Sequence, residues 1–238
     1  DSLRMAEDGR SLIPDADEVL ESLEPAETVL GRRRDSVSGL VRMGMTTGFG
    51  LYFTSRLGEL LDRHPDLSVE VVIRDGFGDL VEEGLDLAVR VGEIAEGSLI
   101  ARKLGVVRKW LVASPACLAR CGTPQHPREL PEYPAIVYNY GGGRHDWNLF
   151  RDEEESVIAP SAVFRANSSE AVLSAVSVDI GIGLLPEFQV RQDVESGKLV
   201  RLFPDWKIPN LPLYAVHTGP RTLPLRTRTV LDFLVEVS

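Results

Sequence analysis

Residues 38–75 read SGLVRMGMTTGFGLYFTSRLGELLDRHPDLSVEVVIRD, and apolar residues recur in this segment with two different periods. Alternation over residues 40–45 predicts a strand. A helix is then predicted from the spacing of Phe49, Phe53, Leu57, Leu60 and Leu61. His64-Pro65 ends this helix, since a proline disfavours helical conformation in the residue before it. A second strand is predicted from the alternation of Leu67, Val69, Val71 and Ile73.

The same order of elements continues after residue 75. A short helix is expected around residues 80–81 and ends at Gly84, and residues 85–91 alternate as a third strand. Strands that alternate with helices in this way are typical of parallel βαβ units.

A second unit with the same alternation follows the first. The strands and helices expected in it are a strand at 135–138, a Gly-rich loop at 141–143, a strand near Val163, a helix at 168–178, a strand at 182–185, a helix start at Pro186, strands at 198–203 and 213–217, and a closing helix through Val230, Leu231, Leu234 and Val237. The sequence therefore predicts an α/β protein made of two units in series.

The chain is acidic, with a formal net charge of −10 over 238 residues. DNA phosphates are bound by clustered Lys and Arg side chains. The run Arg32-Arg33-Arg34 is followed at once by Asp35, which favours a solvated linker over a DNA contact. No apolar run is long enough to cross a membrane, and residues 1–9 lack the apolar core of a signal peptide. We expect a cytoplasmic protein that does not bind DNA well by itself.

The first segment has a heptad pattern, carried by Leu12, Ala16, Val19, Leu23, Ala26 and Leu30. One interpretation is a helix that packs on its own domain. The other is a dimerisation helix, which we favour because polar residues occupy the remaining faces. Pro14 suits a first helical turn, whereas Pro25 is expected to kink or interrupt the helix. Gly31 and the charged run after it end the segment and form a hinge.

Motifs for catalysis, nucleotide binding and metal binding are absent from the sequence. The four histidines are scattered, and no G-x-S-x-G turn occurs to expose a nucleophilic serine. Residues 141–144 lack the GK[ST] ending of a phosphate-binding loop, and Gly181-Ile-Gly183 precedes a strand where a dinucleotide-binding turn would precede a helix. The expectation is a protein that is not an enzyme and that carries no cofactor and no metal.

Two cysteines lie close together in a predicted helix. Cys117 and Cys121 are four residues apart and can share one face of it. Disulfides at this spacing are uncommon, so a reduced pair is expected. With His126 they offer only three metal ligands, which argues against a structural zinc site.

Polar residues stand where predicted strands lead into helices. Thr46 and Thr47 occupy one such turn, and the run from Asn167 to Ser169 occupies another. Hydroxyls and backbone N–H groups at a helix start can cap the helix or hold an anion. The two roles are compatible, because the carboxyl ends of parallel strands face the crevice where ligands bind. Arg90 lies inside an apolar strand and is either a ligand contact or a solvent-facing residue.

At these residues the chain resembles the effector-binding region of LysR-type transcriptional regulators. The tracts that carry the resemblance are, in order, EDG (7–9), DLAVRVG (86–92), LIARKLG (99–105), LVASPACLAR (111–120), GTPQHP (122–127), GIGLLP (181–186) and GKLVRLFPDW (197–206). They are spread over essentially the whole chain. Their order and spacing are the specific part of the resemblance.

The resemblance implies two Rossmann-like lobes joined by two crossing strands, as in type 2 periplasmic binding proteins, preceded by a linker helix. On this basis residues 1–37 form the linker and dimerisation helix. Lobe I comprises residues 38–109 and 215–238, and lobe II comprises residues 110–214. The crossings are expected near residues 110–113 and 213–216.

A small-molecule effector is expected between the lobes. By position in the family, the residues that line its site are Thr46, Thr47, Asp75 and Arg90 from one side, and Ser114, Asn139, Asn167 and Pro186 from the other. The resemblance also implies a homodimer or tetramer. DNA is expected to be bound only through a winged helix-turn-helix, of which residues 1–9 resemble just the tail, so the sequence suggests a fragment or a truncated gene.

Three functions are open at this point. The first is the effector-sensing region of a LysR-type DNA-binding transcription regulator, in which an effector shifts the balance between lobe arrangements. The second is a solute-binding protein of a transport system, which has the same fold but needs a signal peptide. The third is an enzyme on this fold, for which no nucleophile or acid–base pair is evident.

Overall fold

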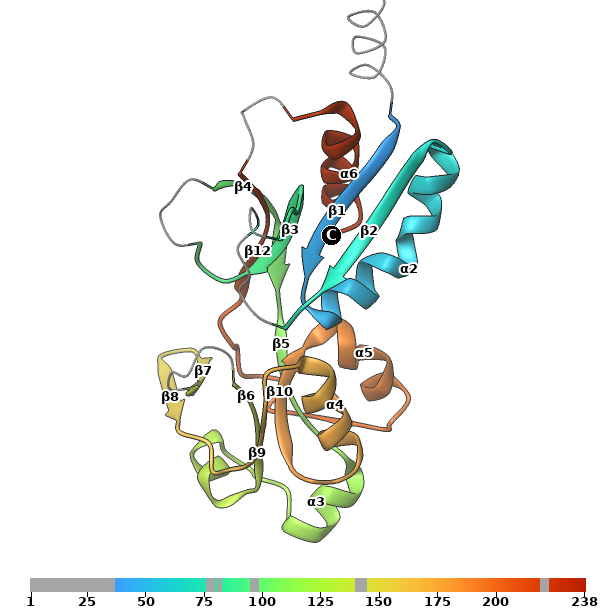
Figure 1. Cartoon of the computed structure of the whole chain (residues 1–238). Coiled ribbons are helices and arrows are strands. Elements are labelled where there is room, and N and C mark those ends of the chain that lie inside the picture. The colour runs from blue at the N-terminus through green and yellow to red at the C-terminus, as the bar shows by residue number, and fades with distance from the viewer. Residues whose placement is uncertain (1–36, 76–79, 81–82, 95–98, 140–144, 219–222) are drawn as a thin grey trace, which may run out of the picture.

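Two five-stranded sheets, one in each of two lobes, organise the part of the chain that the computed structural model describes, residues 37–75, 80, 83–94, 99–139, 145–218 and 223–238 (Figure 1). The first sheet has the order β2 (Leu67–Ile73), β1 (Gly39–Met45), β3 (Leu87–Val91), β12 (Leu211–His217) and β4 (Ile100–Val107). β1 runs parallel to β2 and β3, whereas β12 runs antiparallel to β3 and β4. The first lobe is therefore a parallel unit closed by a strand from late in the chain.

The core of the first lobe follows from the two periods in the sequence. On β1 the residues Val41, Met43 and Met45 are buried, and α2 (Thr47–Arg63) buries Phe53 and Leu60 on the same side. Helix α6 (Leu225–Glu236) adds Val230, Leu231, Phe233 and Leu234 to this core. Burying one such side chain contributes about 1.5–3 kcal/mol, so the amphipathic faces of these helices hold the lobe together.

The second sheet has the order β11 (Val200–Leu202), β5 (Lys109–Ala113), β10 (Ile182–Pro186), β6 (Ala135–Tyr138) and β9 (Ala162–Ala166). Successive residues of a strand point to opposite faces. Accordingly, Leu111 packs in one hydrophobic cluster and Val112 in another. Both faces of this sheet are covered, which explains why its strands read as continuous apolar runs.

The remaining elements of the second lobe surround this sheet. They are α3 (Pro115–Cys121), the 3-10 helix η1 (Pro127–Glu132), the hairpin of β7 (Trp147–Arg151) and β8 (Glu154–Ile158), α4 (Ser169–Ser177) and α5 (Glu187–Glu195). Figure 1 shows α4 and α5 at the junction with the first lobe, below α2.

The chain passes between the lobes twice. The first passage is at Arg108, between β4 and β5, and the second lies in residues 203–210, between β11 and β12. In the structure the second sheet thus begins at Lys109, where the sequence placed the boundary at 110. The return to the first sheet begins at Leu211, where the sequence placed it at 215.

The predicted fold class is confirmed, with differences in detail. The sequence did not predict β4 or the β7–β8 hairpin as strands, and helix α5 extends beyond the start expected at Pro186. All of the predicted linker helix except Val37, residue 81 of the short helix around residues 80–81, and the Gly-rich loop at 141–143 lie outside the described residues. Within the described ranges, no helix has the length and apolar character of a membrane span.

Candidate functional site

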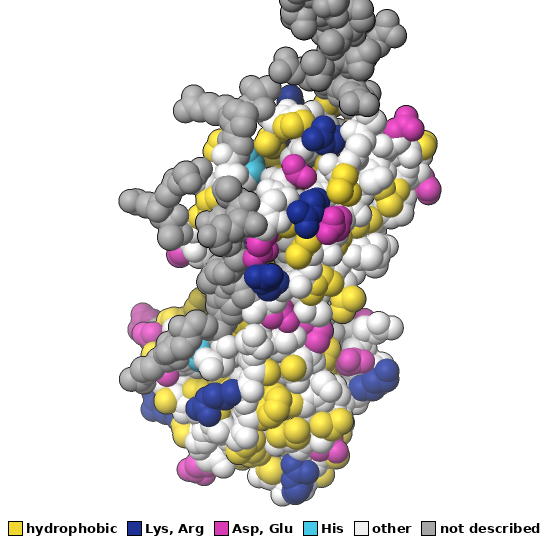
Figure 2. Space-filling model, in the orientation of Figure 1, with side chains coloured by type: hydrophobic (Ala, Val, Ile, Leu, Met, Phe, Trp, Pro, Cys, Tyr) yellow, Lys and Arg dark blue, Asp and Glu magenta, His cyan; other side chains and the backbone are white. Residues whose placement is uncertain are grey.

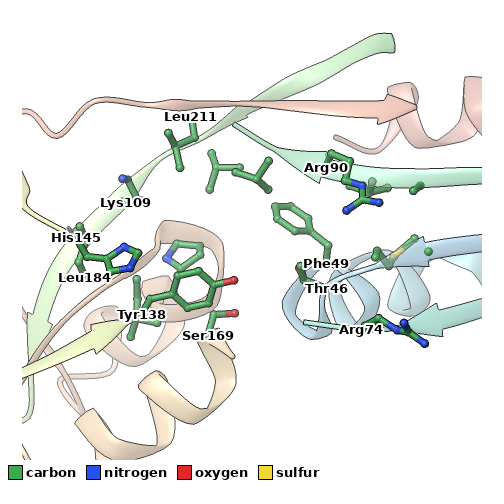
Figure 3. A pocket seen from close by; sticks show the side chains of 18 of the residues that line it. Thr46, Phe49, Arg74, Arg90, Lys109, Tyr138, His145, Ser169, Leu184 and Leu211 are labelled. Atoms are coloured by element: carbon green, nitrogen blue, oxygen red, sulfur yellow. The ribbon is translucent and has the colours of Figure 1, made fainter. Parts of the chain in front are cut away.

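A cavity of about 450 Å3 lies between the lobes, and both lobes contribute its walls (Figure 3). Cavities of about 300–1,000 Å3 are the usual size for small-molecule sites. The walls include the carboxyl ends of β1, β2, β6 and β10, which is where ligands bind in parallel sheets. The position of the cavity therefore follows from the topology of the two sheets.

The wall from the first lobe is mostly apolar. Its apolar residues are Met45, Phe49, Val72, Leu85, Ala88, Val89, Val91, Val107 and Leu211. Thr46, Arg74, Glu83 and Arg90 are its polar residues. Arg74 Nη1 lies 2.8 Å from Glu83 Oε1, so these two charges neutralise each other at the wall.

The wall from the second lobe carries more polar groups. Its polar residues are Lys109, Tyr138, His145, Asp146 and Ser169, beside Trp147, Leu184, Leu185 and Pro186. His145 Nε2 lies 2.8 Å from Asn139 Oδ1, and this hydrogen bond fixes the imidazole. Lys109 begins β5 and is half-buried, and desolvation by burial lowers the pKa of its ammonium.

On the side of helices α2, α4 and α5, the lobes touch through polar contacts. Asp75 accepts hydrogen bonds from the backbone N–H of Thr47 at 2.9 Å and from its hydroxyl at 2.8 Å. Asn167 of the second lobe donates through Nδ2 to the Asp75 carbonyl at 3.2 Å. Asp75 thus joins the start of α2 to the turn before α4.

A second polar group lies beside this contact. Gln189 Nε2 donates to Ser169 Oγ at 3.0 Å and to Glu170 Oε1 at 2.5 Å. A β-carbon at Gly48 would lie 2.5 Å from that amide nitrogen and 2.8 Å from that carboxylate oxygen. A side chain at this position would therefore require the ends of the Gln189 and Glu170 side chains to move aside.

Residues 34–238 match the family described as the LysR substrate binding domain. The chain belongs to this family. CrgA, an HTH-type transcriptional regulator of Neisseria meningitidis serogroup C, is 30% identical over 236 residues, which cover 98% of this chain and 79% of CrgA. An HTH-type transcriptional regulator of Haemophilus influenzae is 29% identical over 209 residues, covering 87% of this chain and 73% of its own length.

Solved structures of LysR-type regulators share the fold. Full-length AphB, a virulence activator of Vibrio cholerae, aligns with a TM-score of 0.80 and 27% identity, covering 98% of this chain and 80% of AphB. The regulatory domain of CrgA aligns with a TM-score of 0.76 and 30% identity, covering 84% of this chain and 98% of that domain. These relatives are transcriptional regulators, which supports the regulator hypothesis over the solute-binding protein.

Three of the eight residues that the resemblance assigned to the effector site line the cavity of this LysR-family chain: Thr46, Arg90 and Pro186. Thr46 precedes α2 but makes no side-chain cap hydrogen bond, so its hydroxyl is not used for capping. Figure 3 shows Arg90 and Thr46 on the first-lobe side of the cavity.

The other five residues lie outside the cavity wall. Asp75 is bonded to Thr47 and to Asn167, as described above for the contact between lobes. Asn139 is hydrogen-bonded through Oδ1 to His145 Nε2. Ser114 accepts a hydrogen bond from the Cys117 backbone N–H at 3.1 Å and so caps α3, at the opposite end of β5 from Lys109.

Sequence reasoning missed Lys109, Tyr138 and His145. A signal for Lys109 existed, because it is a charged residue directly before an apolar strand near an expected crossing between lobes. Tyr138 lies at the carboxyl end of a predicted strand, where ligands bind in parallel sheets, and it could have been included for the same reason as Thr46. His145 follows the Gly-rich loop and carried no usable pattern.

The two cysteines and the possible metal ligands differ in their surroundings. Cys117 is buried and Cys121 is exposed, and both are free thiols. Burial, followed by the nearby Cys121 side chain, raises the pKa of the Cys117 thiol, which disfavours the reactive thiolate. Among the described residues, no three His, Cys, Asp or Glu side chains come together as a metal site.

Proposed function

We propose that this chain is the effector-sensing region of a LysR-type DNA-binding transcription regulator, that it binds a small-molecule effector in the cavity between its lobes, and that it acts as a homodimer or tetramer. The observation that carries the proposal is a cavity of about 450 Å3 whose walls come from both lobes of a LysR-family fold.

The mechanism follows from this shared wall. A ligand that touches both lobes stabilises the arrangement in which both walls reach it, and destabilises none of the contacts within a lobe. A ligand shifts an equilibrium only by its difference in affinity for the two states. Thr46, Arg90 and Pro186 supply contacts from both lobes and so create such a difference.

DNA contact is assigned to a winged helix-turn-helix, as the resemblance implies, and not to the lobes. The formal charge of the chain is −10, and Figure 2 shows basic side chains scattered among acidic ones on the face in view. Proteins that bind DNA present clustered positive charge. A cytoplasmic location and a role outside catalysis follow from the regulator function.

The proposal is tested with a library of neutral, anionic and cationic metabolites in a thermal-shift assay of the full chain. A ligand present at about 100 times its Kd stabilises the folded state by about 2.7 kcal/mol, which such an assay resolves. A hit should lose its effect when Pro186 and Arg90 are replaced together, and should keep it in Ser114→Ala, which lies outside the cavity. If no metabolite stabilises the chain, the effector-binding part of the proposal is wrong.

The oligomer is tested by light scattering. The full chain should have the mass of a dimer or tetramer, and Leu23→Glu, which places a charge in the heptad pattern, should lower that mass. A monomeric full chain would contradict the assembly proposed here.

A further inference from the structure

Lys109 differs from the other charged residues of the cavity in its surroundings. It is half-buried at the first passage between the lobes, and within the described ranges no carboxylate forms an ion pair with it. By contrast, Arg74 is paired with Glu83 at 2.8 Å. The ammonium of Lys109 therefore enters a mostly apolar cavity without a described counter-charge.

An ammonium in such a place is unfavourable for the folded protein alone. Burial removes water from the charged ammonium and so destabilises it, and a nearby anion offsets this loss of hydration. Val107 and Leu211 lie at the two passages and line the same cavity, as does Leu184 of the adjacent strand β10 (Figure 3). None of these side chains can hydrogen-bond the ammonium, and no hydrogen bond or ion pair joins it to the described polar residues of the same wall, so a bound anion can supply the missing partner.

The two helix starts at the cavity are already supplied with negative charge. Helix N-termini attract anions through their free N–H groups. At α2, however, the Thr47 N–H donates to the Asp75 carboxylate. At α4, Glu170 lies in the first turn, where its carboxylate accepts from Ser168 Oγ at 3.0 Å and from Gln189. A second anion at either start would be repelled, which leaves the Lys109 side of the cavity.

We propose that the cavity takes a small carboxylate with an aromatic or branched aliphatic body, and that its carboxylate pairs with the ammonium of Lys109; this inference rests on the proposed function. The apolar body fits the wall formed by Phe49, Val89 and Leu184. One lysine matches one negative charge, whereas doubly charged phosphates are usually held by arginine pairs or free helix starts.

The pairing links binding to protonation. Burial lowers the pKa of Lys109, and a bound carboxylate raises it again. Binding therefore takes up a proton above the lowered pKa, and affinity falls as pH rises through it. Other titratable or charged groups that line the cavity are Arg74, Glu83, Arg90, Tyr138, His145 and Asp146.

The test uses matched acid and amide probes: phenylacetate with phenylacetamide, cinnamate with cinnamamide, and indole-3-acetate with indole-3-acetamide. Each pair keeps the body and removes the charge. Calorimetry on the full chain should give Kd values at least about tenfold lower for the acids. Lys109→Met should weaken the acids at least about tenfold and leave the amides unchanged, and Lys103→Met, an exposed lysine of β4, should bind like wild type.

The pH dependence separates Lys109 from the other groups. Lys109→Arg keeps a positive charge at any accessible pH and retains every other group of the cavity. As pH rises through the lowered pKa toward 10.5, the wild type should lose affinity for the acids, and Lys109→Arg should not.

Three results would overturn the inference. If the amides bind as tightly as the acids, or if a Lys109→Met chain that melts no lower than wild type binds the acids unchanged, the Lys109 pairing is wrong while the cavity remains a binding site. If no acid binds the wild type, the ligand class is wrong. The proposed function is then judged by the neutral and cationic metabolites of the thermal-shift library.

Discussion

The two sides of the cleft between the lobes are built differently. On the helix side, Asn167 of the second lobe donates to the Asp75 carbonyl of the first lobe, while Asp75 also accepts from Thr47 and Gln189 donates to Ser169 within their own lobes. On the hinge side, where the chain passes between lobes, the half-buried Lys109 lies among apolar wall residues such as Val107 and Leu211. The helix side pairs most of these polar groups within the protein, although Gln189 Oε1 is buried without a hydrogen-bond partner among the described residues, and the hinge side leaves Lys109 without a described carboxylate partner.

This difference separates two roles that the sequence placed together. We expected polar residues at helix starts to bind the effector: Thr46 lines the cavity, Thr47 is bonded to Asp75 within the first lobe, and Asn167 contacts the first lobe. Their substitution should change stability and lobe arrangement more than ligand charge preference. Substitution of Lys109 should do the reverse.

The largest effect on the helix side is expected for Asp75→Ala. Two hydrogen bonds to the Asp75 carboxylate, from the Thr47 N–H and hydroxyl, support the first turn of α2. Their loss should lower the free energy of unfolding by about 2 kcal/mol in a urea titration. Asp62→Ala, which removes an exposed carboxylate near the other end of α2, should change it by less than about 0.5 kcal/mol. Equal effects of the two substitutions would show that α2 does not depend on Asp75.

A smaller loss is expected for Gly48→Ala. The new methyl group would push aside the ends of the Gln189 and Glu170 side chains and disturb the hydrogen bond between them, which costs more than the gain in helix propensity. The net loss should be about 1 kcal/mol in a urea titration. Gly58→Ala on the same helix meets nothing within 4 Å and should stabilise the protein by about 0.5–1 kcal/mol. A stabilised Gly48→Ala variant would mean that the lobes separate freely here.

Asn167→Ala should have a still smaller effect. It removes one hydrogen bond between lobes, from an exposed amide to the Asp75 carbonyl at 3.2 Å. A loss of about 0.5 kcal/mol is expected from urea denaturation. The matched control is Asn210→Ala, at an exposed position directly before β12, and it should leave the free energy of unfolding unchanged. Should Asn167→Ala match this control, the contact would add nothing to the closed arrangement.

The smallest effect on stability, and the only stabilising one on the hinge side, is expected for Lys109→Met without ligand. Because burial lowers the Lys109 pKa, the unfolded chain binds more protons than the folded chain between that pKa and 10.5. The destabilisation due to Lys109 is therefore complete below the lowered pKa and disappears as pH rises toward 10.5. Lys109→Met should melt slightly higher than wild type at pH 7, and the difference should vanish at alkaline pH. A lower melting temperature at pH 7 would reveal a stabilising partner for Lys109.

Much of the fold was predictable because periodicity reports burial within one element. The alternation in β1 and β2 and the helical spacing in α2 were read correctly from residues 38–75. Strand β4 was missed because most of its residues are exposed and its burial does not alternate. The β7–β8 hairpin was missed because residues 152–155 are four consecutive acidic residues, a pattern typical of a solvated loop. In the structure Glu154 lies 3.2 Å from Arg128 and 3.1 Å from Arg151, so part of that run is paired.

The site was less predictable, for a physical reason. A pattern at a helix start shows that polar groups are needed there, but it does not show which group satisfies them. The partner of Thr47 is Asp75, 28 residues away, and the partner of Asp75 is Asn167, 92 residues away. Such pairings depend on how two lobes meet, which local spacing does not record.

The order of strands in the first sheet also matters for synthesis of the protein. β12 lies between β3 and β4, and it is made after the whole of the second lobe. On the ribosome, β4 has no neighbouring strand until Leu211–His217 has emerged, and the helix α6 that covers the core comes later still. The second lobe is continuous from Lys109 to Ile208, since Trp206 and Ile208 pack in its core, and it can close before that point. The lobe whose first strand is made first is thus the last to be completed.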